Sequence, residues 1–333
     1  MPTFTVFRGS ESGAPVKSTT TKPDELAGDL VYVKVTASGV CGTDLHYRKR
    51  DVVLGHEGVG VVEAVGPEVK HLKKGDRVGW GYETDSCGQC TQCLGADEIY
   101  CPERAIYGGD MSKDQGSFAT GAVWREAFLH QIPDNLSDEA AAPLQCGGAT
   151  VYTALLGAKP TDTVGIMGVG GLGHLAIQFA AKMGCRVVVL SGSDRKKDEA
   201  TKLGAHEFVA MSGMTAEKAA QVTPIDRLVV TMSGQPDWST VVPMLTPRAR
   251  IYPLGVSFDD FSIPYMALIQ KGIIIQGSLV ATRAVHREML AFAAFHQILP
   301  VMEKFPMTEQ GIQDALDNLD KGKVHYRAVL IPA

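Results

Sequence analysis

The sequence contains no run of about 18 apolar residues, the length that a membrane-spanning helix requires. Its N-terminal segment lacks the basic start and apolar block of a secretory signal. A formal net charge of −5 gives no basic surface for nucleic acid. These absences predict a cytoplasmic protein that binds neither nucleic acid nor membranes.

Disulfide bonds are not expected either, although the chain has 7 cysteines. The count is odd, and four of the cysteines crowd between residues 87 and 101. In a chain without a secretory signal, such crowding favours a bound metal over disulfides.

Two patterns divide the 333 residues, which are too many for one simple core. Between about residues 29 and 80, valines alternate with polar residues, as in strands packed on one face. From Thr161 onward, apolar strands alternate with helical segments, which is typical of a doubly wound parallel sheet. We therefore expect a β-rich catalytic domain at residues 1–148, an α/β dinucleotide-binding domain at 149–284, and a segment, 285–333, that completes the first domain. RAVHREMLAFAAFH predicts a helix, and GIIIQGSLV and YRAVLIP predict strands.

A glycine pattern marks the start of the α/β domain. It follows the apolar strand TVGIM and opens an apolar helix, as a dinucleotide-binding turn requires. The glycines let the backbone approach a pyrophosphate at the helix N-terminus. The alternative is a tight turn without a ligand. The pattern G-x-G-x-x-G consists of Gly168, Val169, Gly170, Gly171, Leu172 and Gly173.

The second strand of this domain is not followed by the acidic residue that binds the ribose of NAD. Hydroxyl and basic side chains there would bind a 2′-phosphate instead, so we expect NADP(H). Asp194 comes three positions too late and is expected to cap the next helix. The alternative is that the basic residues only form a solvated helix start. The phosphate-binding candidates are Ser191, Gly192, Ser193, Arg195 and Lys196.

The crowded cysteines follow the spacing C-x2-C-x2-C-x7-C. Four thiolates on one loop make a closed tetrahedral zinc site that is structural rather than catalytic. An iron–sulfur cluster usually has three residues, not seven, before its last cysteine. A nucleic-acid-binding zinc ribbon conflicts with the surrounding acidic residues. The ligands of this structural zinc are Cys87, Cys90, Cys93 and Cys101.

A catalytic zinc needs three protein ligands and one open position. Cys41, His56 and Cys146 supply a Cys2His set, and each alone is more often an ordinary buried residue. Asp44 and Glu57 are candidates for supporting or exchanging with these ligands. Thr43 and His46 have the hydroxyl and imidazole that a proton relay to solvent needs.

Taken together, the chain resembles the zinc-dependent medium-chain alcohol dehydrogenases, most of all the cinnamyl alcohol dehydrogenase branch. The shared motifs are C-G-T-D-L-H, G-H-E, the four-cysteine lobe, P-L-x-C-x-G, G-x-G-G-x-G-H and V-L-S-G-S-D-R-K-K. The resemblance implies a GroES-like domain carrying two zincs and a Rossmann domain that binds NADP(H). It implies that Cys41, His56 and Cys146 bind the catalytic zinc and that Glu57 is a transient ligand. It also places Ser278 and Arg327 near the nicotinamide and pyrophosphate, and it implies a homodimer formed through GIIIQGSLV of the Rossmann sheet.

Two departures from the family stand out. Nine residues separate His46 from His56, about six fewer than is common, so the wall of the substrate entrance is expected to differ. Gly192 stands where the branch usually has Ser or Arg, which removes one phosphate donor.

The expected function is a hydride transfer between NADP(H) and a primary alcohol or aldehyde, aromatic substrates included, with aldehyde reduction favoured. The alternatives are a reductase of activated double bonds on the same fold and a non-catalytic NADPH-binding protein. A complete ligand set and relay argue against both.

Overall fold

The computed structural model describes residues 3–332 and divides the chain into two compact units. Unit 1 comprises Met1–Ala149 and Val280–Ala333, and unit 2 comprises Thr150–Leu279. Within residues 3–332, no helix is both long enough and apolar enough to cross a membrane.

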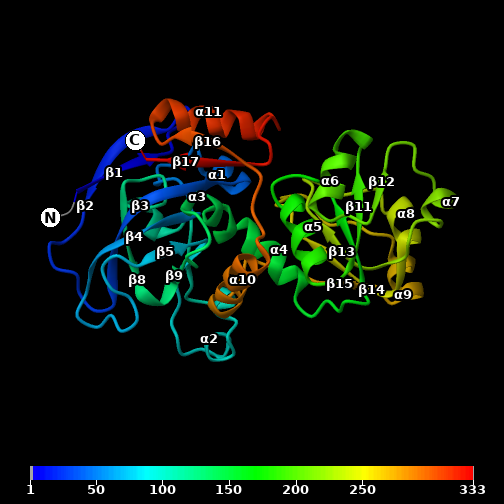
Figure 1. Ribbon diagram of the computed structural model, residues 1–333, viewed down its shortest axis with the longest axis horizontal. Helices are drawn as coiled ribbons and strands as arrows, with labels where there is room; N and C mark the ends of the chain where they lie inside the picture. Colours follow the sequence, from blue (N-terminus) through cyan, green and yellow to red (C-terminus); the bar gives the residue numbers. More distant parts are fainter. Residues whose placement is uncertain (1–2, 333) are drawn as a thin grey trace. The chain divides into compact units, whose positions relative to one another are not determined.

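Unit 1 is built on a seven-stranded sheet in the order β16-β17-β3-β4-β5-β9, with β8 also paired to β3. Neighbours are antiparallel except β16 and β17. The last strand of the chain lies beside β3, with Ala328 opposite Val40 (Figure 1). The strands of unit 1 are β1 (Thr3–Arg8), β2 (Val16–Thr21), β3 (Leu30–Val40), β4 (Gly58–Val65), β5 (Arg77–Trp80), β6 (Glu83–Asp85), β7 (Ala105–Ile106), β8 (Gly121–Arg125), β9 (His130–Gln131), β16 (Met302–Pro306) and β17 (Arg327–Ile331).

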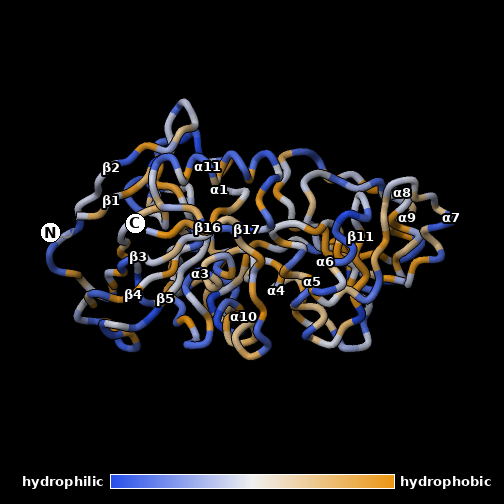
Figure 2. Tube along the Cα trace, turned by 45° about the horizontal axis from the view of Figure 1, so that its top comes forward, coloured by the Kyte–Doolittle hydropathy of each residue, from blue (hydrophilic) through white to orange (hydrophobic). Residues whose placement is uncertain are grey.

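Short helices connect these strands, and two longer ones belong to the C-terminal segment. Figure 2 shows hydrophilic stretches along α11, which buries only its inner residues such as Ile312 and Leu316. The helices are α1 (Gly42–Tyr47), α2 (Thr91–Leu94), η1 (Glu98–Tyr100), η2 (Asp110–Lys113), η3 (Glu126–Phe128), α3 (Asp138–Ala141), η4 (Pro143–Gln145), α10 (Arg283–His296) and α11 (Glu309–Asp320), with α4 (Gly147–Leu155) leading into unit 2.

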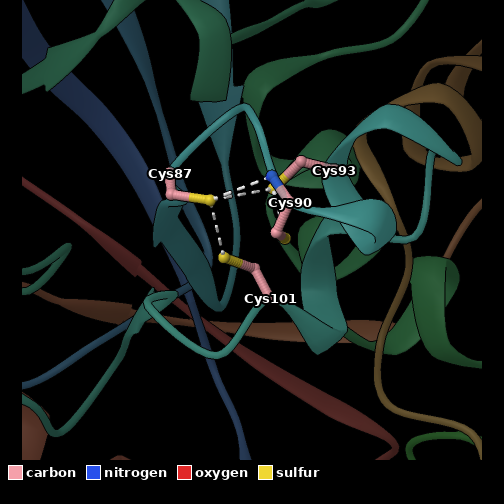
Figure 3. A group of neighbouring side chains, drawn as sticks. All are labelled: Cys87, Cys90, Cys93 and Cys101. Carbon is pink, nitrogen blue, oxygen red and sulfur yellow. Dashed lines mark hydrogen bonds between the residues drawn. The ribbon is translucent and has the colours of Figure 1, made fainter.

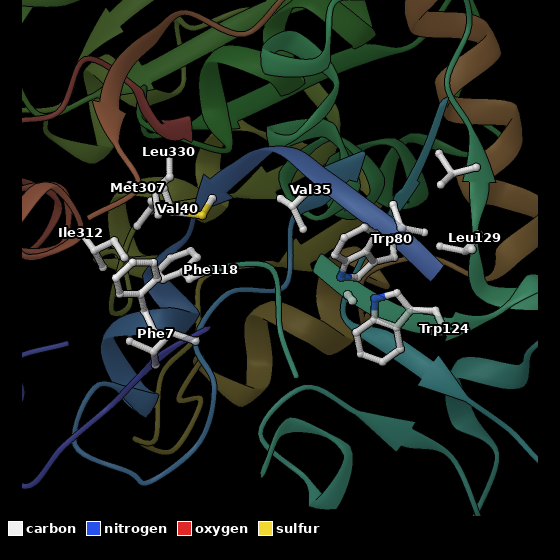
Figure 4. Packing of buried hydrophobic residues seen from close by; sticks show 14 of the residues in the cluster. Phe7, Val35, Val40, Trp80, Phe118, Trp124, Leu129, Met307, Ile312 and Leu330 are labelled. Atoms are coloured by element: carbon white, nitrogen blue, oxygen red, sulfur yellow. The ribbon is translucent and has the colours of Figure 1, made fainter. Parts of the chain in front are cut away.

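The C-terminal segment completes the core of unit 1. Ile312 and Leu330 belong to the same buried cluster as Phe118, and all three are fully buried (Figure 4). Trp80 and Trp124 lie in this cluster with ring centroids 5.9 Å apart, so their role is packing. Burying apolar surface of this size contributes about 2 kcal/mol per large side chain, which ties the tail to the N-terminal strands.

Unit 2 is a six-stranded parallel sheet in the order β12-β11-β10-β13-β14-β15. The strand order reverses beside β10, all of whose residues are buried. Ligands of such sheets bind at the carboxyl ends of the strands at this reversal. The elements are β10 (Thr163–Met167), α5 (Gly173–Lys182), β11 (Arg186–Ser191), η5 (Asp194–Lys196), α6 (Lys197–Leu203), β12 (Glu207–Ala210), α7 (Ala216–Ala219), β13 (Ile225–Val230), α8 (Trp238–Val241), η6 (Val242–Met244), β14 (Leu245–Pro253), α9 (Tyr265–Lys271) and β15 (Ile274–Ile275).

The predicted strand GIIIQGSLV is shorter than expected. Only Ile274 and Ile275 form β15, and the Gln276 N–H still donates to the carbonyl of Ile251 on β14. The register then sets Gly277 opposite Pro253, where β14 ends. Proline has no N–H to donate and glycine favours strands weakly, so the pairing stops there.

Candidate metal centre and cofactor site

Four side chains with metal-binding atoms converge in unit 1: Cys41, His56, Glu57 and Cys146. Their ligand atoms all lie within 4.8 Å of one another. Cys41 follows β3, His56 and Glu57 precede β4, and the Gly39 N–H donates to the carbonyl of Glu57. Pairing of β3 with β4 thus brings together ligands that are distant in the sequence, and Cys146 joins them from the loop between η4 and α4.

His56 is oriented by Asp44. Their Nδ1 and Oδ1 atoms lie 3.0 Å apart, and the side chains are 1% and 0% exposed. Burial alone would lower the pKa of His56, but the negative charge and hydrogen bond of Asp44 raise it overall. Nδ1–H donates to the carboxylate, and Nε2 is buried with no hydrogen-bond partner among the described residues. A metal bound at Nε2 would displace the proton that the raised pKa favours there. An orphaned imidazole nitrogen that faces two thiols fits a metal ligand.

The two thiols differ in acidity. Hydrogen bonding between them lowers the pKa of Cys41 and raises the pKa of Cys146, to which burial adds. The Cys41 N–H also donates to Asp44 Oδ2 over 2.8 Å. A soft, partly deprotonated pair beside one imidazole is the donor set that catalytic zinc prefers, with three protein ligands and room for a fourth.

Glu57 is held by Arg327. Both carboxylate oxygens accept from Arg327 Nη2, and the two side chains are 0% and 5% exposed. Burial raises the pKa of Glu57 to about 7, and the charge of Arg327 opposes part of this rise. A Cβ at Gly39 would lie 1.9 Å from Glu57 Oε2, so only glycine fits there. The structure therefore places Arg327, expected near a pyrophosphate, on the carboxylate beside the metal group.

Thr43 and His46 both lie on α1. Thr43 Oγ1 is 3.8 Å from Cys41 Sγ and half-buried, whereas His46 is exposed in the last turn. Residues three apart on a helix share a face. The Thr43 hydroxyl beside the metal-binding group and the exposed His46 imidazole therefore lie on the same side of α1.

Two tyrosines that the sequence analysis did not identify contact His56 of this group. The ring of Tyr107 stacks on His56 with centroids 4.6 Å apart, and its hydroxyl accepts from the Gly55 N–H over 2.9 Å. Tyr82 meets the same imidazole edge-on at 6.0 Å. Neither tyrosine belongs to a metal-binding or relay motif, so only the fold reveals them.

The short segment between His46 and His56 is tied down on both sides. The Gly9 N–H, just after β1, donates to the Val52 carbonyl over 3.0 Å. Arg48 Nη2 pairs with Asp317 of α11 at 3.0 Å. The segment therefore packs against the unit's first strand and last helix.

The four predicted lobe cysteines also converge. Their sulfurs lie within 4.8 Å of one another, and Figure 3 shows the side chains pointing toward a common centre. The sulfurs of Cys90 and Cys93 are 3.5 Å apart, as are those of Cys87 and Cys101, which is far beyond disulfide bonding. Backbone N–H groups donate to Cys87 and Cys101 Sγ over 3.4 Å. A sulfur-only cage with such N–H···S bonds fits a structural zinc.

In unit 2, the glycine turn lies at the end of β10. Gly168 has φ +97°, and a Cβ at Gly173 would lie 1.9 Å from the Gly168 carbonyl, so the turn itself requires both glycines. A Cβ at Gly170 or Gly192 would meet no described atom within 4 Å. The protein's own packing leaves open space there, which fits the close approach of a dinucleotide. Gly171 and Leu172 complete the turn, and α5 begins without a side-chain cap.

A pocket of about 410 Å³ opens beside this turn. Gly168, Ser191 and Gly192 line it, together with residues that the sequence did not single out: Met211, Met214, Met232 and Gln235. Methionines at scattered positions carry no motif, which is why the pattern of the sequence missed them. Ser278, placed near the nicotinamide by resemblance, has a buried Oγ without a partner among the described residues.

The predicted phosphate-binding residues split into two groups. Lys196 Nζ donates to the Val169 carbonyl over 2.5 Å, and burial lowers its pKa, so this ammonium lies at the glycine turn. Arg195 is exposed, and its Nε donates to Ser193 Oγ over 3.3 Å. The expected cap at Asp194 is wrong: Ser193 precedes η5, Asp194 is the first residue of that turn, and α6 starts at Lys197 without a side-chain cap.

Comparisons with known proteins agree on one family. The family profile "Alcohol dehydrogenase GroES-like domain" matches residues 27–134, and "Zinc-binding dehydrogenase" matches residues 171–294. An alcohol dehydrogenase of Geobacillus stearothermophilus is 36% identical over 93% of this chain and 94% of its own length. Cinnamyl alcohol dehydrogenase 7 of Arabidopsis thaliana is 35% identical over 90% and 87%.

A solved structure extends this agreement to the fold. A cinnamyl alcohol dehydrogenase from Sorghum bicolor superposes with a TM-score of 0.91, covers 99% of this chain and 98% of its own, and is 32% identical. The GroES-like and Rossmann architecture is thereby confirmed. The chain belongs to the zinc-dependent medium-chain alcohol dehydrogenases, in the branch that contains the cinnamyl alcohol dehydrogenases.

Proposed function

We propose that this zinc alcohol dehydrogenase transfers a hydride between NADP(H) and a primary alcohol or its aldehyde, and works mainly as an aldehyde reductase. The observation that carries the proposal is the convergence of Cys41, His56 and Cys146, with His56 Nε2 buried and without a hydrogen-bond partner in the described part of the chain. We further propose one zinc there and one among the four lobe cysteines. When bound, the catalytic zinc supplies a Lewis acid and the nicotinamide supplies the hydride.

The chain's own residues orient the reactants and move the proton. Asp44 orients the ring of His56. Arg327 donates to the Glu57 carboxylate and so holds it next to the three zinc ligands. The Thr43 hydroxyl donates its proton to the nascent alkoxide of the substrate and regains one from solvent through His46. Tyr107 covers one face of His56, which limits the access of water.

The NADP(H) preference rests on what lies after β11. Ser191 lines the pocket, and Lys196 lies half-buried at the glycine turn. Two carboxylates nearby, that of Asp194 and that of Asp237 in the pocket lining, are on exposed residues. A 2′-phosphate would gain charge-assisted hydrogen bonds there and meet no buried negative charge.

The test is to follow reduced-coenzyme absorbance with aromatic and aliphatic aldehydes, using NADPH and NADH in parallel. Wild-type protein should prefer NADPH, and Ser191→Asp should lower kcat/KM for NADPH by roughly tenfold or more while sparing NADH. Lys202→Ala, at an exposed residue in the last turn of α6, is the matched control and should change the ratio little. Equal use of both coenzymes would refute the preference. Turnover of enones or other activated double bonds without aldehydes would favour that alternative activity.

We also propose a homodimer formed through the sheet of unit 2. Strand β15 lies at the sheet edge, and apolar side chains near it are exposed. Edge strands with exposed apolar neighbours tend to pair with another chain. The exposed residues are Tyr265, Met266, Ile269 and Ile275. Light scattering that gives a monomer at micromolar concentration would refute this arrangement.

A further inference from the structure

Glu98 belongs to the four-cysteine lobe but binds a helix outside it. Its carboxylate is 2% exposed and accepts from the Arg283 backbone N–H over 2.6 Å and from Arg283 Nε over 3.1 Å. Arg283 is the first residue of α10. N–H groups at a helix start lack intrahelical partners, and this end favours a negative charge. The lobe thus holds the beginning of α10.

One turn along the same helix, His286 reaches the loop that carries Cys146. Its Nε2–H donates to Gln145 Oε1 over 2.9 Å. Burial lowers the pKa of His286 to about 3, so the ring is neutral and keeps its single proton for this bond. Gln145 Nε2 donates to the Ala141 carbonyl over 3.0 Å, which turns the amide oxygen toward His286. The ring of His130 stacks on that of His286 with centroids 4.0 Å apart.

Gln145 is enclosed on its other side by the backbone around the end of β5. It is 0% exposed. A Cβ at Gly79 would lie 2.6 Å from the side-chain amide carbon of Gln145. A Cβ at Gly81 would lie 2.4 Å from the backbone carbonyl oxygen of Gln145. A side chain fixed between strand and helix fixes its own backbone, and Cys146 is the next residue.

We propose that Glu98 and His286 are positioning residues for the Cys146 thiolate. Glu98 of the lobe fixes the position of the first turn of α10, and α10 in turn positions His286. His286 orients the side chain of Gln145, which fixes the position of Cys146, the next residue. Neither residue belongs to the group of side chains that could hold the metal. The inference rests on the proposed zinc at Cys41, His56 and Cys146, and it assigns the lobe a role in shaping that second metal site.

The test measures the metal rather than turnover. The catalytic group is loaded with Co²⁺ while the lobe keeps zinc; thiolate–cobalt absorption reports the coordination, and chelator competition gives the affinity. His286→Leu should lower cobalt affinity about tenfold or more and shift the bands, as loss of a residue that orients a ligand does. His286→Gln keeps an N–H donor and should recover most of the affinity. Glu98→Ala should lower affinity in the same direction, and the double variant should be less than additive because both residues act through one path.

Asn135→Ala is the matched control, because Asn135 Nδ2 donates to the Ala294 carbonyl over 2.9 Å at the far end of α10. It should leave the spectrum and affinity unchanged. An equal loss in Asn135→Ala would overturn the inference, since any loosening of the helix would then suffice. Wild-type spectrum and affinity in Glu98→Ala, or in a folded His286→Leu, would also overturn it. A wild-type protein that binds no cobalt at the Cys146 group would instead refute the proposed function.

Discussion

Among single residues, Asp44 has the largest expected influence on the metal group. It is 0% exposed, contacts His56 Nδ1 and accepts from the Cys41 N–H, so it organises two ligands at once. A buried carboxylate of this kind both orients an imidazole and strengthens it as a donor.

Asp44→Asn should therefore weaken metal binding about 10- to 100-fold, because the amide keeps the shape but loses the charge. Chelator competition on the zinc-loaded protein measures this. Asp51→Asn changes an exposed carboxylate on the neighbouring segment and serves as the control. Unchanged affinity in Asp44→Asn would show that the pair does not serve the metal.

Glu83 gives a prediction about pH. Burial and the nearby Glu98 carboxylate raise its pKa from 4.5 to about 8. Between these values the folded protein holds a proton that the unfolded chain has released, so the free energy of unfolding falls as pH rises from 4.5 toward 8.

The side chain in Glu83→Gln stays neutral at every pH. Between pH 4.5 and 8 the free energy of unfolding of this variant should therefore fall by roughly 1–3 kcal/mol less than that of the wild type, or several degrees less in Tm. Thermal unfolding of both proteins at pH 5 and pH 8.5 provides the comparison. Parallel pH profiles would contradict the raised pKa.

The residue scale also shows where sequence reasoning ends. The ligand-type residues were predictable because metal chemistry restricts them to a few side chains at characteristic spacings. Tyr107, Gln145 and His286 were not, since each acquires its role from neighbours that the fold brings from distant segments.

Among the elements, α11 is the clearest case of local rules agreeing with packing. Thr308 precedes it in extended conformation, and its side chain accepts from the Gly311 N–H over 3.1 Å. Ile312, Ala315 and Leu316 then recur at helical spacing on the buried side. Because α11 packs into the core of unit 1, its cap contributes to the stability of the whole unit.

Thr308→Ala should lower the free energy of unfolding by about 1 kcal/mol, or about 2–4 °C in Tm. Thr308→Ser keeps the accepting oxygen and should stay close to wild type. Thermal unfolding followed by circular dichroism tests both variants; equal destabilisation by Ala and Ser would show that the cap bond is not the cause.

Elements with strong periodicity were predicted well, whereas ends and edges were not. The segment RAVHREMLAFAAFH coincides with α10 because its apolar spacing and the capping Thr282 agree. The strand predicted at GIIIQGSLV shrank to Ile274–Ile275, since a partner strand ending in proline sets its length. Strand length here depends on the neighbour, which no local pattern contains.

At the scale of the whole molecule, each unit holds its own chemistry. Unit 1 contains both groups of metal-binding side chains, and unit 2 contains the glycine turn and its pocket. Unit 1 is discontinuous in sequence, and its core needs both segments. Deletion of the C-terminal segment should therefore unfold unit 1 as a whole and not merely shorten it.

The central claim is that the Cys41, His56 and Cys146 group holds a zinc ion on which hydride transfer depends. The most direct measurement is the zinc content of the wild-type protein and of Cys146→Ser, taken together with their rates of NADPH-dependent aldehyde reduction. The account predicts about two zinc ions per wild-type chain, and about one with no turnover in Cys146→Ser. Full turnover in a Cys146→Ser protein that has lost one zinc, or a wild type that reduces aldehydes with zinc only in the four-cysteine lobe, would contradict it.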